Sequence, residues 1–236
     1  MTSNVTTSTD VVSATHCVPP GTREYIDRTI QDLLASLPDP QQLSPVGRRG
    51  IIARYTAVLE GNFVYWMTSA YLSVKSWEAH QIIDDNLREE VRDNHPGMLR
   101  RFAMAAHAVP TDTDIMAVHG HVHEVRKFIG RLRSESILPM MAFFEGFIQR
   151  FMPYLADLAV RQGSSELEYT EVHGVVDVGH TEELYRALNA EVLLAHGPLD
   201  KMRMLEGVEI LRKVLEVVIH HSNTEKLETV VASTNR

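Results

Sequence analysis

The sequence predicts an all-α protein with a single domain, and three observations support this. Apolar residues recur at helical spacing through most of residues 21–222. No alternating run between turn signals predicts a strand, and the β-branched runs VVDV and EVVI each lie inside a longer helical pattern. No repeat or linker divides the chain. We therefore expect one domain over residues 21–222, preceded by a flexible leader (1–20) and followed by a polar tail (223–236).

The first helix is predicted over residues 22–37, because a Thr cap and an acidic first turn precede an apolar stripe. Residues 46–76 are apolar on every side, which predicts a long central buried helix. Residues 76–109 form the next helical segment, beginning after a Ser cap. A bend or break is expected within it at His95, because Pro96 disfavours helical geometry in the residue before it.

The apolar pattern in the second half of the sequence predicts four more helices, and one of them is very apolar. That helix is expected over residues 134–163, where Pro139 and Pro153 each predict a kink or a helix start. The other three are predicted over residues 110–132, 164–197 and 199–222. The total is about seven helices.

Composition excludes several classes of function. The 236 residues include 44% hydrophobic residues and carry a net charge of −8 without a long Lys/Arg block, so we expect no nucleic-acid partner. No stretch approaches the roughly 20 apolar residues that span a bilayer, and the N-terminus lacks a signal-peptide pattern. Cys17 is the only cysteine, which excludes an intrachain disulfide and a thiolate-built metal site. A cytoplasmic protein without a membrane segment is expected.

The stretch EVHGVVDVGHT carries the first candidate ligands. His173, Asp177 and His180 are separated by helical steps of four and seven residues, so their side chains lie along one face. Valines flank that face, and we assign Tyr169 to the opposite one. The spacing alone leaves two interpretations open. The three residues are metal ligands, or they are surface and hydrogen-bonding polar residues.

Two further clusters favour a metal site. Glu145 lies in the apolar run MMAFFEGFIQRFM. A carboxylate buried there requires a positively charged partner, which is either a metal ion or an arginine side chain. The segment NLREEVRDNHPGML adds Glu89, Glu90 and His95. Three helices thus supply carboxylates and imidazoles but no thiolate. That is the ligand chemistry of two iron or manganese ions in a helical core.

These motifs resemble the heme-oxygenase-like diiron oxidases. The resemblance covers roughly residues 45–222, and the His-x3-Asp-x2-His spacing is its most specific part. It implies the seven-helix bundle shared with heme oxygenase, thiaminase-II-like proteins and the pyrroloquinoline-quinone synthase group. The metal ligands it implies are Glu90, His95, Glu145, His173, Asp177 and His180.

The same resemblance implies a function. Two Fe(II) ions would use O2 as co-substrate to oxidise a small aliphatic molecule, with a free amino acid of natural-product biosynthesis as the favoured substrate. Desaturation, C–C cleavage, C–N cyclisation and N-oxygenation all occur in that class, and a fatty-acid substrate is an alternative. Homodimers are common in this fold, so the resemblance also implies a possible homodimer. The leading alternative is a metal-free or cofactor-binding protein of the same fold, which is either quinone-synthase-like or binds an organic ligand.

The chain departs from the family pattern at two places. The separation of Glu90 and His95 is shorter than in relatives, which leaves Glu89 as an alternative ligand. Some N-oxygenating relatives carry an extra glutamate on the preceding helix, and Glu60 fits that role poorly. Desaturation or cleavage is therefore favoured over N-oxygenation.

Other residues are weaker candidates. His119, His121 and His123 alternate along a predicted helix, so successive side chains point about 200° apart and do not converge. His80 is in the wrong context for a heme ligand. Cys17 lies in the leader, unlike the catalytic cysteine of the thiaminase-type relatives.

Overall fold

The computed structural model describes residues 17–195, 197 and 199–221. The predicted tail and most of the predicted leader lie outside this part of the chain. Within helix α8, introduced below, the side chains of residues 175–178 are also outside the description.

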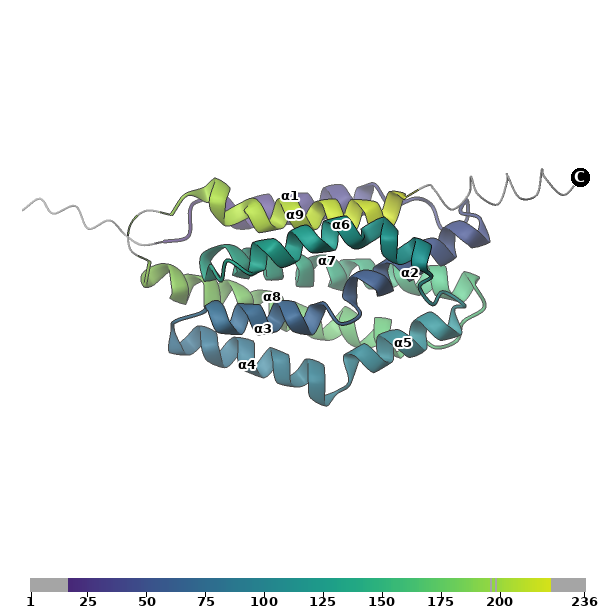
Figure 1. The fold of residues 1–236 in the computed structure, drawn as a ribbon, viewed down its shortest axis with the longest axis horizontal. Coiled ribbons are helices and arrows are strands. Elements are labelled where there is room, and N and C mark those ends of the chain that lie inside the picture. Colours follow the sequence, from purple (N-terminus) through teal and green to yellow (C-terminus); the bar gives the residue numbers. More distant parts are fainter. Residues whose placement is uncertain (1–16, 196, 198, 222–236) are drawn as a thin grey trace, which may run out of the picture.

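The described part of the chain is all-helical and forms one elongated bundle (Figure 1). Its nine helices are α1 (Thr22–Ala35), α2 (Pro45–Leu59), α3 (Phe63–Ser73), α4 (Trp77–Arg92), α5 (His95–Ala105), α6 (Asp112–Ile129), α7 (Ser134–Arg161), α8 (Glu168–Leu193) and α9 (Lys201–His220). None of these helices is both long and apolar enough to cross a membrane.

The helix predicted over residues 46–76 is interrupted and forms α2 and α3. Gly61 adopts a left-handed conformation with φ of 74°, which ends α2 at Leu59. Asn62 holds the interruption in place. Its Nδ2 donates to the carbonyl of Val58 at 2.8 Å, and its Oδ1 accepts from Arg126. This interruption is one reason that the helix count exceeds the predicted seven.

The predicted break is confirmed, but it lies at Asp93 and Asn94, because His95 is itself the first residue of α5. Helix α4 ends at Arg92, Asn94 has a left-handed φ of 58°, and α5 begins at His95 with Pro96 in its first turn. Proline is compatible with this position because the first N–H groups of a helix have no intrahelical acceptor. The break separates α4 from α5 and accounts for a second additional helix.

Helix α7 runs through the core and packs along α8 and α9 (Figure 1). Pro139 and Pro153 both lie inside this continuous 28-residue helix, so the prediction of a helix start at either proline is wrong. Every residue from Ser136 to Ile148 is buried. At Pro139, packing on all sides therefore outweighs the backbone hydrogen bond that the proline removes, whereas Pro153 is exposed.

Glu191 of α8 fixes the start of α4. Its carboxylate accepts hydrogen bonds from the backbone N–H groups of Lys75 and Ser76 at 2.9 and 2.7 Å, and from the Ser134 hydroxyl at 2.7 Å. Burial opposes ionisation of Glu191, but these donors outweigh it and lower the pKa of the carboxyl group. The contact anchors α4 at its N-terminus, and the opposite end of α4 enters the candidate site.

Candidate metal centre

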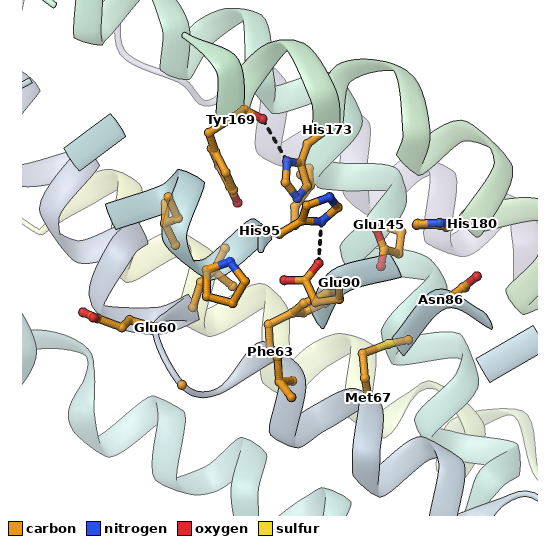
Figure 2. Close-up of a pocket in the computed structure, with 16 residues that line it drawn as sticks. Glu60, Phe63, Met67, Asn86, Glu90, His95, Glu145, Tyr169, His173 and His180 are labelled. Atoms are coloured by element: carbon orange, nitrogen blue, oxygen red, sulfur yellow. Dashed lines mark hydrogen bonds and ion pairs between the residues drawn. The ribbon is translucent and has the colours of Figure 1, made fainter. Parts of the chain in front are cut away.

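Three predicted ligands converge from three helices. Glu90 lies in the last turn of α4, His95 begins α5, and His173 lies near the start of α8. One ligand atom from each residue lies within 4.8 Å of the other two. All three side chains are buried, and they face one another in Figure 2.

The break between α4 and α5 brings Glu90 and His95 together. In an unbroken helix, residues five apart point about 140° away from each other. Here the left-handed Asn94 redirects the chain, and Nδ1 of His95 lies 2.7 Å from Oε2 of Glu90. An ionised carboxylate only accepts hydrogen bonds, so the Nδ1–H of His95 donates to it.

His173 is held as a neutral imidazole. Its Nδ1–H donates to the backbone carbonyl of Tyr169 at 2.8 Å, which leaves the lone pair on Nε2. The ring contacts Tyr169 and His95, with centroid distances of 4.2 and 4.6 Å. Burial and the neighbouring His95 lower the pKa of His173 to about 4. Neutral imidazole is the form that binds a metal, so His173 needs no deprotonation near pH 7.

Two other predicted ligands, Glu145 of α7 and His180 of α8, line the same cavity as these three residues. The cavity has a volume of about 90 Å³. Glu145 is only 3% exposed, as expected from its apolar sequence context. The remaining lining residues are Leu59, Glu60, Gly61, Phe63, Val64, Met67, Asn86, Pro96, Leu99, Ile148 and Tyr169 (Figure 2).

Glu89, the alternative ligand, lies outside the three-residue group. Its Oε2 is 2.9 Å from Nε2 of His180. The Glu89 side chain is 40% exposed, compared with 10% for Glu90. Glu90 therefore faces the interior with His95 and His173, whereas Glu89 lies beside His180.

The sixth predicted ligand, Asp177, lies within α8, but its side chain is outside the described residues. The structure thus brings five of the six predicted residues to one cavity, and three of these five form the compact group.

Glu60 lies at the rim of the cavity. Its side chain is 42% exposed and forms an ion pair with Arg100, whose side chain is 67% exposed. Glu60 thus has a cationic partner on the protein surface, unlike the buried Glu90.

The other histidines and the cysteine lie elsewhere. On α6, His119 and His123 are exposed and His121 is half-buried. His80 packs its ring against Tyr71 at a centroid distance of 5.0 Å. Cys17 is exposed and precedes α1.

Sequence reasoning missed Tyr169. Assigning it to the face opposite His173 was wrong, because residues four apart on a helix lie on the same face. Tyr169 is 3% exposed, lines the cavity and contacts the His173 ring. Its hydroxyl lies 2.9 Å from that of Tyr55 on α2. The spacing from His173 was the signal that could have identified it.

The donor set fits a first-row transition metal. Two imidazoles and one carboxylate converge in a buried location, the combination that non-heme Fe(II) oxygenases use. The carboxylate of Glu90 would partly offset the charge of a divalent ion there, and a second carboxylate, that of Glu145, lines the same cavity. Thiolates are absent from this cavity among the described residues, which makes a structural zinc site of the cysteine type unsuitable.

Comparison of the chain with protein-family models, curated proteins and solved structures found no match.

Proposed function

We propose that the chain is an O2-dependent non-heme diiron oxidase or oxygenase with a heme-oxygenase-like fold. The observation that carries this proposal is the buried group of Glu90, His95 and His173 on the wall of a cavity. Burying a carboxylate and two imidazoles together has a desolvation cost that a bound cation would offset. The motif resemblance adds iron and oxygen to that chemistry.

Glu90, His95 and His173 would hold the first ion. Glu145 and His180 line the same cavity and would hold the second, together with Asp177 according to the resemblance. The metals would supply oxygen activation. Because the three histidines reach the cavity from two helices and the glutamates from two others, correct folding of the bundle is required to assemble the ligand set.

The protein's own contribution is to fix the ligands and limit access of water. The Tyr169 carbonyl accepts the Nδ1–H of His173, which orients that imidazole through the nitrogen that would not bind metal. Tyr169 packs against the His173 ring and restricts its rotation.

The cavity lining supports an aliphatic substrate. Leu59, Phe63, Val64, Leu99 and Ile148 form much of its wall. Neither lysine nor arginine lines it among the described residues, so a substrate carboxylate would depend on the metals for a cationic partner. A cavity of about 90 Å³ has no room for a long acyl chain, which favours a small substrate over a fatty acid. Desaturation or cleavage is the favoured outcome, and C–N cyclisation and N-oxygenation are the alternatives.

The test is anaerobic loading with Fe(II), followed by metal analysis and exposure to O2 with a panel of amino acids and fatty acids. We expect about two irons per chain and substrate-triggered oxygen consumption. Parallel loading with Mn(II) distinguishes the two metals. His173→Ala should lose the first of the two irons while keeping its helical circular-dichroism spectrum. Absence of iron binding, together with an organic ligand detected by native mass spectrometry, would instead support the metal-free alternative.

A further inference from the structure

A second pocket, which shares no lining residue with the first, lies where the turn between α6 and α7 meets the first turns of α9. These segments lie at the same end of the bundle in Figure 1. The pocket has a volume of about 330 Å³, within the range of about 300–1,000 Å³ that is typical of small-molecule sites. Its lining residues are Phe128, Arg131, Arg133, Ser136, Ile137, Arg203 and Glu206.

The pocket is positively charged in an acidic protein. Three arginines line it against one glutamate, although the whole chain has 31 acidic and 23 basic residues. Arg131 bonds to Glu206 at 2.7 Å. Arg203 has only a long contact of 3.7 Å with Asp200, in which both side chains are mostly exposed. Two of the three guanidinium groups therefore retain most of their donors for another anion.

Backbone geometry directs the arginines to one place. Leu132 has a left-handed φ of 50°, which is costly for a residue other than glycine. It reverses the chain between Arg131 and Arg133, and both side chains line the pocket. The first turn of α7 begins directly after Arg133, so the positive end of that 28-residue helix lies beside the same pocket.

The base of the pocket is rigid. Phe128 is 3% exposed and Ile137 is fully buried. The Ser136 hydroxyl donates to the Arg203 carbonyl at 3.1 Å and joins α7 to α9. The guanidinium of Arg131 lies over the Phe128 ring at 5.6 Å, which limits its orientations. Arg131 is thus held over a buried base by Phe128 and Glu206, and Arg133 and Arg203 line the same pocket.

We propose that this arginine pocket binds a small organic anion through a phosphate or carboxylate group. Guanidinium groups bind both through paired, charge-assisted hydrogen bonds. Arg133 and Arg203 supply the main contacts, and Arg131 contributes while it remains bonded to Glu206. The pocket is separate from the metal ligands, so the proposal does not depend on the proposed oxidase function.

Isothermal titration calorimetry of the full chain with inorganic phosphate and with citrate, at constant ionic strength in chloride, tests the proposal. We expect saturable binding of at least one anion at millimolar concentration. Phosphate binding alone would indicate a phosphate ester as the ligand, and citrate binding alone would indicate a carboxylate. Arg133→Gln and Arg203→Gln should each weaken binding at least about tenfold, since a charge-assisted hydrogen bond is lost.

Arg161→Gln provides the matched control. Arg161 is the last residue of α7, at the end of that helix away from Arg133, and it pairs with Asp157. This variant should bind the anion as the wild type does. Thermal melts of all three variants check that they fold. The proposal is overturned if neither anion binds saturably, or if both pocket variants bind as tightly as Arg161→Gln.

Discussion

Glu89 and Glu90 are adjacent in α4, but their carboxylates contact different histidines. Oε2 of Glu90 lies 2.7 Å from Nδ1 of His95, and Oε2 of Glu89 lies 2.9 Å from Nε2 of His180. Successive helical residues point about 100° apart, so the two side chains diverge although their backbones are neighbours. This difference separates the two candidate ligands that the sequence left open.

Glu90→Gln should weaken binding of the first metal ion by about 100-fold or more, because even a residue that only orients a ligand changes affinity by about 10–100-fold. Glu89→Gln should leave that affinity within a few-fold of wild type, since Glu89 lies outside the group formed by Glu90, His95 and His173. Calorimetric titration with Mn(II) measures both. Equal losses in the two variants would contradict the assignment.

Removing either Glu145 or His180 should reduce the metal content from two ions per chain to one. Both residues line the cavity but lie outside the compact three-residue group. The first ion should therefore still bind to Glu145→Gln and His180→Ala. It should also still raise their melting temperature, because a ligand that binds only the folded state stabilises it. Elemental analysis after anaerobic loading measures the stoichiometry. Two retained ions, or none, would contradict the proposed division of ligands.

Much of the helical fold could be predicted because helical periodicity is a local signal. The break before His95 was predictable from Pro96, because proline is favoured in the first turn of a helix and disfavoured in its interior. The break at Gly61 was missed. A glycine inside an apolar run is compatible with a continuous helix, and only the contacts of Asn62 with Val58 and Arg126 show that the chain turns there.

For the site, the sequence could predict ligand chemistry but not the relative positions of the helices. The buried location of Glu145 followed from its apolar neighbours. The contact between Glu90 and His95 depends on the left-handed conformation of Asn94. The sequence predicted a break in the helix there, but not the direction in which the chain continues after it. Tyr169 could have been identified from its spacing to His173.

Gly207→Ala should destabilise the protein by about 1–3 kcal/mol, the usual cost of overpacking a core. A Cβ at Gly207 would lie 2.5 Å from Cε1 of Phe128 and 3.0 Å from Cβ of Met140, both buried. Gly120 on the exposed face of α6 is the matched control, because its Cβ would meet no atom within 4 Å. Gly120→Ala should stabilise by about 0.5–1 kcal/mol. Urea unfolding measures both, and a neutral Gly207→Ala would contradict the close packing of α9 on α6 and α7.

Asp114 links α6 to α2 and makes stability dependent on pH. Its carboxylate accepts from Arg49 at 2.7 and 3.1 Å, and from the Thr111 backbone N–H and hydroxyl at 2.8 and 2.6 Å. Burial opposes ionisation, but these hydrogen bonds outweigh it and lower the pKa of Asp114 below its ordinary value. The unfolded chain, with an aspartate pKa of about 3.9, therefore takes up a proton at higher pH than the folded protein.

The stabilisation from Asp114 is therefore fully present above about pH 4, which is the pKa of an aspartate in the unfolded chain. It is lost as the pH falls through the lower pKa that Asp114 has in the folded protein. Asp114→Asn should cost about 1–3 kcal/mol at pH 7, because it weakens the contacts with Arg49 and Thr111. The difference from wild type should shrink in acid, where the wild-type carboxyl group is also protonated. Glu124→Gln, on the exposed face of the same helix, should change stability little at either pH. Urea denaturation of the three proteins at neutral and acidic pH measures this, and an Asp114→Asn deficit that stays constant with pH would exclude the linkage.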